Sequence, residues 1–330
     1  MKWVLLYPTV IFLCLEIAFR IMGYGSFHND DYSIKATPKN AYVGHEDLGI
    51  QLNPGRYKIT LNDKVKFVAN HNEGNHRFVP ESRYSAAPDL LFLGCSFTYG
   101  YGVNDDENFP SLIQKEFPEL SVRNAGVIGY GTVQSLIQLK EAVEEGSVKT
   151  VLLNFSSFHF IRNNLSQAYR SNLKIGYQRS SSEVDNQMKN SRFPLKASCD
   201  SEIEFQPWET MYSNWAGREW LAAINWMQSA YDNSKDDVEN QSEITACIIS
   251  EMAELCKKKG IVFGVVCLDT TAETKKLKTK LSNIPWLEIN FDFGNKKYTN
   301  LPYDSHPNKR GHRLIAKRMK SFLNDLLNEN

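Results

Sequence analysis

From residue 88 onward, short apolar runs alternate with longer stretches in which apolar residues recur at helical spacing. The apolar runs predict strands at residues 90–93, 121–124, 150–155, 261–268 and 286–289. The amphipathic stretches predict helices at residues 109–117, 133–145, 238–259, 273–281 and 309–327. Strands that alternate with helices build a parallel sheet from βαβ units. The sequence therefore predicts an α/β fold, a three-layer α/β/α sandwich around a five-stranded parallel sheet of flavodoxin type.

The region before this domain has a different pattern. Residues 24–43 are polar and rich in turn-forming residues, which predicts a tether. Residues 49–61 and 65–70 alternate apolar and polar positions on either side of Asn62 and Asp63, as the strands of a β-hairpin do. We expect this hairpin to pack on the main domain near the membrane side, and a binding role is the alternative.

The amino terminus is mostly apolar. Residues 3–22 are about as many as a helix needs to cross a bilayer. Glu16 and Arg20 lie four positions apart on one helical face, so they can pair near one end of such a helix. We therefore expect residues 1–24 to be a signal anchor, a transmembrane helix through which the protein associates with a membrane.

A cleaved signal peptide is the alternative for this segment. No A-x-A cleavage pattern follows the apolar run, and Leu13 before Cys14 does not resemble a lipoprotein box. Lys2 favours a short inner end. The bulk of the chain is then expected on the extracytoplasmic side, which is periplasmic or extracellular.

Residues 161–237 interrupt the alternation of strands and helices with a polar insertion. An insertion of this length is typical of a mobile loop or a functional lid. Its tryptophans, on a predicted helix, favour a packed cap, with a sugar-stacking surface as the alternative; they are Trp208, Trp215, Trp220 and Trp226. We therefore divide the chain into an anchor (1–24), a tether with the hairpin (25–87) and an α/β domain (88–330).

Charge and cysteine content narrow the classes of partner and cofactor. The 330 residues include 38 Lys plus Arg and 38 Asp plus Glu, so no net field would attract nucleic acid. The chain has no glycine-rich phosphate loop or dinucleotide fingerprint. Its cysteines form no C-x-x-C pair and no zinc-site spacing; they are Cys14, Cys95, Cys199, Cys247, Cys256 and Cys267. We expect no nucleic acid, no cofactor, no metal site and no disulfide framework.

Two stretches far apart in the chain carry candidate catalytic residues. The first predicted strand ends at Gly94, shortly before Ser96, and Asp304 and His306 stand just before the last predicted helix. Parallel strands place their carboxyl ends at one edge of the sheet, so these side chains can meet there. A serine becomes a nucleophile when a histidine accepts its proton and a carboxylate orients that histidine. The pattern predicts a Ser-His-Asp triad.

In these stretches the chain resembles the bacterial SGNH hydrolases, the superfamily of GDSL-type esterases and lipases. It is most similar to a membrane-anchored branch with a G-D-S-F-T-Y-G block. The resemblance extends over about residues 90 to 330, and its matching blocks are residues 94–100, 124–132 and 304–308.

The resemblance implies roles for individual residues. Ser96 would be the nucleophile, His306 the general base and Asp304 its orienting partner. The backbone N–H groups of Ser96 and Gly129 would form the oxyanion hole, where a glycine allows close approach of the substrate. The implied substrate is a small-molecule or glycan ester.

Two positions depart from the pattern of that superfamily. Cys95 stands where an aspartate is usual, which we interpret as a structural position. Phe158 stands where the family has the asparagine of Gly-x-Asn-Asp, whose amide is a third oxyanion donor; losing one donor lowers rates about a hundred- to a thousandfold. The candidate replacements are Asn154, His159 and Asn163, although Asn154 could instead face a helix and His159 could be a core histidine.

An α/β-hydrolase is the competing enzyme fold. Its nucleophile elbow requires Gly-x-Ser-x-Gly, and Thr98 occupies the last of those positions here. The two-residue spacing from Asp304 to His306 is also too short for that fold. We therefore predict a serine-dependent ester hydrolase that acts outside the cytoplasm. Two alternatives stay open: an O-acyltransferase or deacetylase of a surface polysaccharide, and a catalytically silent binding module.

Overall fold

The computed structural model describes residues 2–28, 32–83, 89–146, 148–178 and 188–328. Its centre is a five-stranded sheet in the order β12-β11-β8-β6-β7, and every neighbouring pair is parallel. In chain order this is the 2-1-3-4-5 arrangement of flavodoxin-like folds, so the predicted fold class is confirmed. The strands are β6 (Leu90–Gly94), β7 (Val122–Asn124), β8 (Thr150–Phe155), β11 (Val262–Cys267) and β12 (Trp286–Glu288).

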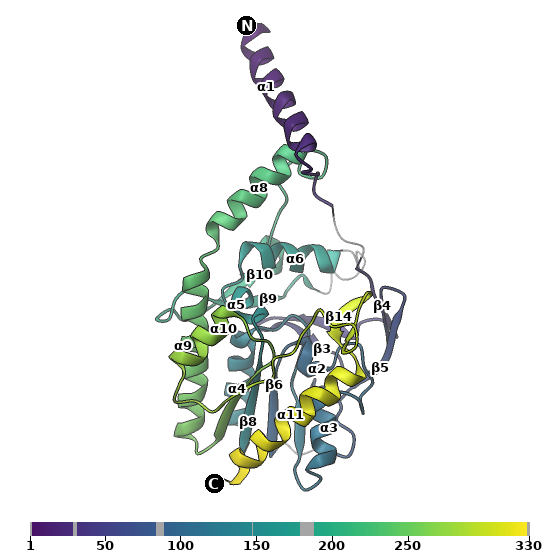
Figure 1. Cartoon of the computed structure of the whole chain (residues 1–330), viewed down its shortest axis with the longest axis vertical. Helices are drawn as coiled ribbons and strands as arrows, with labels where there is room; N and C mark the ends of the chain where they lie inside the picture. The colour runs from purple at the N-terminus through teal and green to yellow at the C-terminus, as the bar shows by residue number, and fades with distance from the viewer. Residues whose placement is uncertain (1, 29–31, 84–88, 147, 179–187, 329–330) are drawn as a thin grey trace.

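Helices cover both faces of this sheet (Figure 1). One face is covered by α4 (Thr132–Glu145), α9 (Val238–Lys258) and α10 (Ala272–Lys280). The other is covered by α3 (Phe109–Glu116) and α11 (Lys309–Asn328). These helices correspond to the predicted ones, with ends that differ by one residue at most.

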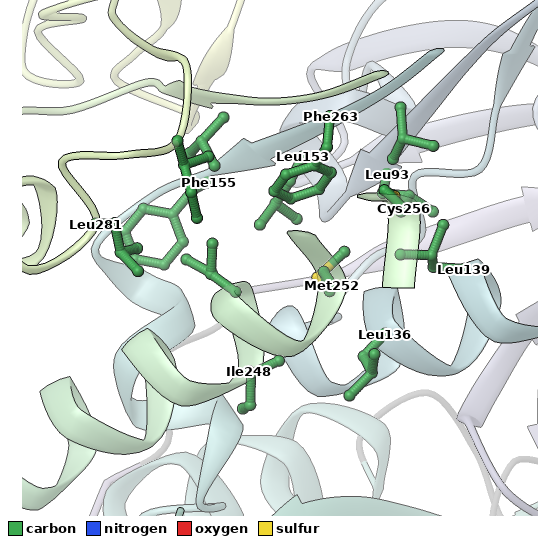
Figure 2. Close-up of a cluster of buried hydrophobic side chains, with 14 of the residues drawn as sticks. Leu93, Leu136, Leu139, Leu153, Phe155, Ile248, Met252, Cys256, Phe263 and Leu281 are labelled. Carbon is green, nitrogen blue, oxygen red and sulfur yellow. The ribbon is translucent and has the colours of Figure 1, made fainter. Parts of the chain in front are cut away.

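Each face of the sheet has its own hydrophobic core, because successive strand residues point to opposite faces. Leu91 and Leu93 of β6 belong to the core beneath α4 and α9, whereas Leu90 and Phe92 belong to the core beneath α3 and α11. Figure 2 shows the first of these cores, in which side chains of β6, β8 and β11 lie opposite those of α4 and α9. Both faces of the sheet are therefore buried. A functional site can form only at an edge of the sheet, such as the carboxyl ends of its strands.

The segment before the α/β domain is more ordered than a tether. Strands β1 (Ile34–Thr37), β4 (Gly55–Leu61) and β5 (Val65–His71) form an antiparallel sheet, and β2 (Tyr42–His45) pairs with β3 (Gly49–Leu52). The predicted hairpin is confirmed for β4 and β5, which turn at Asn62 and Asp63 with φ of 47° and 55°. Residues 49–52 are not part of that hairpin, since Asn53 and Pro54 interrupt the run and β3 pairs with β2. We call residues 32–83 the N-terminal extension.

A buried arginine attaches the N-terminal extension to the α/β domain. Arg77 forms isolated bridges to His71 of β5 and to Asn124 of β7. Its side chain is fully buried, with Nε 2.6 Å from Asp105 Oδ1 and Nη2 donating to the Val103 carbonyl at 2.9 Å. In an ion pair this deeply buried, the hydrogen bonds offset the cost of removing both charges from water. Removal of one partner therefore leaves an uncompensated buried charge.

Replacing Arg77 with methionine is expected to lower the free energy of unfolding by about 3–5 kcal/mol, because the Asp105 carboxylate would stay buried without its cation. Urea unfolding followed by circular dichroism measures this loss. The matched control is Lys35→Met, which removes the exposed pair with Asp63 and is expected to cost less than about 1 kcal/mol. Equal losses in the two variants would contradict the role assigned to Arg77.

The insertion forms a cap with its own small core. Trp208 is buried in that core, which supports the packed-cap interpretation for this residue. Trp215, Trp220 and Trp226 are 42%, 75% and 42% exposed, and of these only Trp226 lies on a helix. The prediction of one helix carrying all four was wrong, since residues 211–221 between Trp208 and the helix that carries Trp226 are irregular and turn at Gly217. The elements of the cap are α6 (Gln167–Gln178), β9 (Arg192–Lys196), β10 (Ile203–Pro207), η1 (Trp208–Thr210) and α8 (Ala222–Lys235).

A disulfide joins this cap to helix α9. Cys199, in the turn between β9 and β10, is bonded to Cys247 of α9, 48 positions along the chain, with Cα atoms 5.5 Å apart. The prediction of no disulfide was therefore wrong. Spacing alone does not reveal the pair, because the turn of the insertion approaches α9 only in the folded chain. Cys95, Cys256 and Cys267 are buried and free, as small hydrophobic residues would be.

Helix α1 (Lys2–Ile21) covers the apolar segment at the amino terminus and extends away from the rest of the molecule (Figure 1). The expected pair forms, with Arg20 Nε 2.6 Å from Glu16 Oε1. The same carboxylate accepts the backbone N–H groups of Ala222 and Ala223 at 3.0 and 2.9 Å, and so caps the amino end of α8. Among the described residues, no helix is both long and apolar enough to cross a membrane. The predicted signal anchor is therefore not supported.

Candidate active site

Ser96 lies at the carboxyl edge of the sheet, two residues after the last residue of β6. It is the first residue of the short helix α2 (Ser96–Tyr99) and is only 6% exposed. The sharp turn from strand to helix depends on Gly94, which has φ of +147° and whose added Cβ would lie 2.8 Å from the Asn154 carbonyl oxygen. The glycine is thus required by backbone conformation and by the neighbouring strand β8.

Asp304 and His306 lie on β14 (Asp304–Pro307), which pairs with β13 (Thr299–Asn300) before the last helix. His306 Nε2 is 2.8 Å from Ser96 Oγ, and His306 Nδ1 is 2.8 Å from Asp304 Oδ1. Asn300 Nδ2 donates to the His306 carbonyl at 3.2 Å and holds this backbone in place. The structure therefore brings the predicted serine, histidine and aspartate into one continuous chain of hydrogen bonds.

The carboxylate of Asp304 determines the tautomer of the histidine. Burial by itself raises the pKa of Asp304, but hydrogen bonds from His306 and Tyr32 outweigh burial and hold the pKa below its ordinary value. An ionised carboxylate only accepts hydrogen bonds, so His306 Nδ1 carries the proton and Nε2 is free to accept from the serine hydroxyl. The rings of Phe97 and Tyr101, at 5.0 and 4.9 Å, flank the imidazole.

Gly129, the second residue of the expected oxyanion hole, lies in the loop that follows β7. It has φ of +76°, and its carbonyl accepts a short hydrogen bond from the hydroxyl of Tyr169 on α6. Asn124 at the end of β7 ties this loop to α2, since its Nδ2 donates to the Thr98 carbonyl at 2.9 Å. In the described part of the chain, the N–H groups of Ser96 and Gly129 donate to no protein acceptor.

The three candidate replacements for the third donor have hydrogen-bond partners within the fold. Asn154 Nδ2 donates to the Leu93 carbonyl at 3.0 Å, across the sheet. Asn163 Oδ1 accepts from the N–H of Thr132 at 2.6 Å and caps α4. His159 is fully buried beside Thr132, and burial holds its pKa well below the ordinary value. These side chains stabilise the fold, and His159 is the core histidine that was the alternative.

Helix α5 (Phe158–Asn163) instead places an aromatic ring and a cation beside the site. Phe158 is 42% exposed, and its ring centroid lies 6.0 Å from that of Phe97, the residue after Ser96. One turn later, Arg162 Nη1 donates to the Tyr130 carbonyl at 2.9 Å, and its guanidinium lies 5.5 Å from the Tyr169 ring. A positive charge therefore sits next to the Gly129 loop, a feature that sequence analysis missed although Phe158 and Arg162 are four positions apart.

Among the residues that the structure describes, no group of three or more His, Cys, Asp or Glu could hold a metal ion.

No protein-family model matches the chain, and no curated protein does either. Several solved structures are similar to it. The psychrotrophic esterase EstA from Pseudoalteromonas sp. is 13% identical, with 72% of this chain and 98% of that chain covered and a TM-score of 0.39. A member of the lipolytic protein G-D-S-L family from Veillonella parvula is 12% identical, with 70% and 96% covered and a TM-score of 0.38.

A two-domain esterase active on acetylated mannans is also similar, at 13% identity. It has 73% of this chain and 50% of that chain covered, with a TM-score of 0.39. Because these TM-scores are low, the similarity carries no argument about the activity of this chain.

Proposed function

We propose that the protein is a serine-dependent ester hydrolase of the SGNH type. The observation that carries this proposal is the chain of two 2.8 Å contacts from Ser96 Oγ through His306 to Asp304, at the carboxyl edge of the sheet. The blocks around Ser96, Gly129 and His306 that resemble this superfamily support it further. A buried serine with a hydrogen-bonded base and an orienting carboxylate is the arrangement of an activated nucleophile.

The geometry supports acyl transfer in two stages. His306 Nε2 accepts the proton of Ser96 as Oγ attacks the ester carbonyl, and Asp304 stabilises the imidazolium that forms. The N–H groups of Ser96 and Gly129 bind the negative oxygen of the tetrahedral intermediate. The protonated histidine then gives its proton to the leaving alcohol, and a water molecule, activated by the same histidine, hydrolyses the acyl-enzyme.

We propose further that the protein acts outside the cytoplasm. Disulfides persist in oxidising compartments and are rare in the cytosol. The disulfide between Cys199 and Cys247 supports an extracytoplasmic location, periplasmic or extracellular. In that setting the substrate is an ester of a small molecule or of a glycan.

Incubation of the full-length protein with p-nitrophenyl acetate and with a fluorophosphonate probe tests the proposal. We expect release of p-nitrophenol and covalent labelling of the peptide that contains Ser96. Folded protein that remains unlabelled would contradict the proposal and favour a silent binding module. Acyl transfer to an added glycan in preference to water would favour an O-acyltransferase that uses the same residues.

Replacing Tyr169 with phenylalanine is expected to lower kcat about tenfold with little change in KM. The hydroxyl of Tyr169 holds the carbonyl of Gly129. Without this hydroxyl, the backbone N–H of Gly129 can move relative to the oxyanion. Steady-state hydrolysis of p-nitrophenyl acetate measures the effect. Tyr212→Phe is the matched control, because its hydroxyl donates to Asp232 at 2.6 Å within the same insertion. Equal kinetics in both variants would contradict this role for Tyr169.

A further inference from the structure

The N-terminal extension contacts the carboxylate of the candidate triad directly. Tyr32 Oη donates to Asp304 Oδ2 at 2.6 Å, although the two residues lie 272 positions apart in the chain. Oδ1 of the same carboxylate accepts from Nδ1 and from the backbone N–H of His306, each at 2.8 Å. The Asp304 side chain is only 3% exposed, so these three donors replace water around it.

The turn of the β4–β5 hairpin holds Tyr32 in this position. Asn62 Oδ1 accepts the N–H of Ser33 at 2.7 Å, and Asn62 Nδ2 donates to the carbonyl of Tyr303 at 2.8 Å. One side chain thus connects the residue after Tyr32 to the residue before Asp304. The left-handed conformation of Asn62, with φ of 47°, is one that asparagine adopts more readily than most residues.

A second contact leads from the same hairpin to the histidine. The ring of Phe67 on β5 lies 5.6 Å from the ring of Tyr101, which in turn lies 4.9 Å from the His306 imidazole. Tyr32 itself stays a hydrogen-bond donor, since burial and the neighbouring Asp304 charge raise the pKa of its hydroxyl far above the ordinary value. The extension therefore contacts Asp304 directly, and it reaches His306 only through the ring of Tyr101.

We propose that the N-terminal extension completes the catalytic site, with Tyr32 as a positioning residue that holds the Asp304 carboxylate in the orientation that His306 requires. This inference rests on the proposed ester hydrolase function. A phenol bonded to Oδ2 leaves Oδ1 for the histidine and prevents rotation of the carboxylate. It also withdraws negative charge from the carboxylate, which moderates how strongly Asp304 stabilises the protonated imidazole.

The test compares Tyr32→Phe with Tyr57→Phe in the full-length protein. Tyr57 lies on β4 of the same extension, and its hydroxyl donates to the Pro54 carbonyl at 3.1 Å, away from the triad. For Tyr32→Phe we expect kcat for p-nitrophenyl acetate to fall about tenfold with KM almost unchanged. Without the phenol, the Asp304 carboxylate regains negative charge and stabilises the protonated imidazole more strongly. The acid limb of the profile of kcat/KM against pH should therefore move to higher pH. Tyr57→Phe should keep the wild-type kcat and pH profile.

Asn62→Asp tests the clamp separately. This substitution keeps the acceptor for the Ser33 N–H but removes the donor to the Tyr303 carbonyl. We therefore expect kcat to fall only a few-fold, less than in Tyr32→Phe. A Tyr32→Phe variant with the wild-type kcat and pH profile would overturn the inference while leaving the hydrolase proposal intact.

A readout that needs no turnover separates the two proposals. In ¹⁵N-histidine-labelled protein, the proton that His306 Nδ1 shares with Asp304 gives a low-field NMR signal, which His306→Gln assigns by its loss. We expect this signal to shift in Tyr32→Phe and to stay in place in Tyr57→Phe. If the wild-type protein hydrolyses no ester but the signal shifts as expected, the hydrolase proposal fails and the positioning of Asp304 stands. An unchanged signal in Tyr32→Phe contradicts the positioning role.

Discussion

Replacing Ser96 with alanine is expected to lower kcat for p-nitrophenyl acetate by about 10⁵- to 10⁶-fold, the scale of loss when a catalytic serine is removed. In the proposed mechanism Oγ is the atom that attacks the carbonyl, and it lies 2.8 Å from His306 Nε2. The proposed oxyanion donors are backbone N–H groups of Ser96 and Gly129, so they remain in the variant. The residual rate therefore reports what binding and oxyanion stabilisation contribute without a nucleophile.

The matched control for this variant is Ser121→Ala. Ser121 is 7% exposed, as Ser96 is 6% exposed, and its hydroxyl donates to the Arg83 carbonyl at the opposite edge of the sheet. Ser121→Ala should retain hydrolysis and fluorophosphonate labelling, whereas Ser96→Ala should lose both with an unchanged far-ultraviolet circular dichroism spectrum. Hydrolysis by Ser96→Ala at the wild-type rate would disprove the assignment of the nucleophile.

Replacing Asp304 with asparagine is expected to lower kcat about 10²- to 10³-fold. The His306 backbone N–H and Nδ1 both approach Oδ1, so the amide oxygen must take that position and the amide nitrogen must face Tyr32. The hydroxyl oxygen of Tyr32 can accept a hydrogen bond from that nitrogen. The histidine therefore keeps its tautomer and loses only the negative charge that stabilises the imidazolium, which costs less than the about 10⁴-fold loss seen when a triad aspartate is replaced and the tautomer changes.

Steady-state kinetics of Asp304→Asn beside Asp292→Asn checks this expectation. Asp292 is exposed and accepts the N–H of Gly294 at 2.9 Å, so its amide variant should hydrolyse p-nitrophenyl acetate at the wild-type rate. A loss of about 10⁴-fold or more in Asp304→Asn would indicate that the imidazole has changed tautomer. That outcome would contradict the orientation inferred for the amide.

The α/β domain is well predicted because its signals are local. Each buried strand is a short apolar run, and each helix has an apolar face at helical spacing, so the periodicity of neighbouring residues is enough to place them. The meeting of Ser96 with Asp304 and His306 is also predictable, since parallel strands all end at the same edge of the sheet. The N-terminal extension is predicted less well: the alternation reveals β4 and β5, but the pairing of β2 with β3 depends on the break at Pro54.

The rest of the site depends on contacts between residues that no sequence spacing relates. Tyr32 reaches Asp304 because the hairpin turn at Asn62 packs against the loop before β14. Tyr169 reaches Gly129 because the cap folds over the block that follows β7. Asn154 is one of three candidate replacements for the third oxyanion donor by sequence, but in the structure its amide donates across the sheet to the Leu93 carbonyl.

By itself, the sequence determined the order of strands and helices, the parallel sheet and the three residues of the candidate triad, because these follow from local periodicity and from the common direction of parallel strands. The tertiary structure alone decided that Tyr32 contacts Asp304 of that triad, and that Tyr169 and Arg162 hold the carbonyls of Gly129 and Tyr130. It also decided the pairing of Cys199 with Cys247 and the use of Glu16 as a cap for α8. These contacts join segments far apart in the chain, and their geometry exists only after both cores have packed.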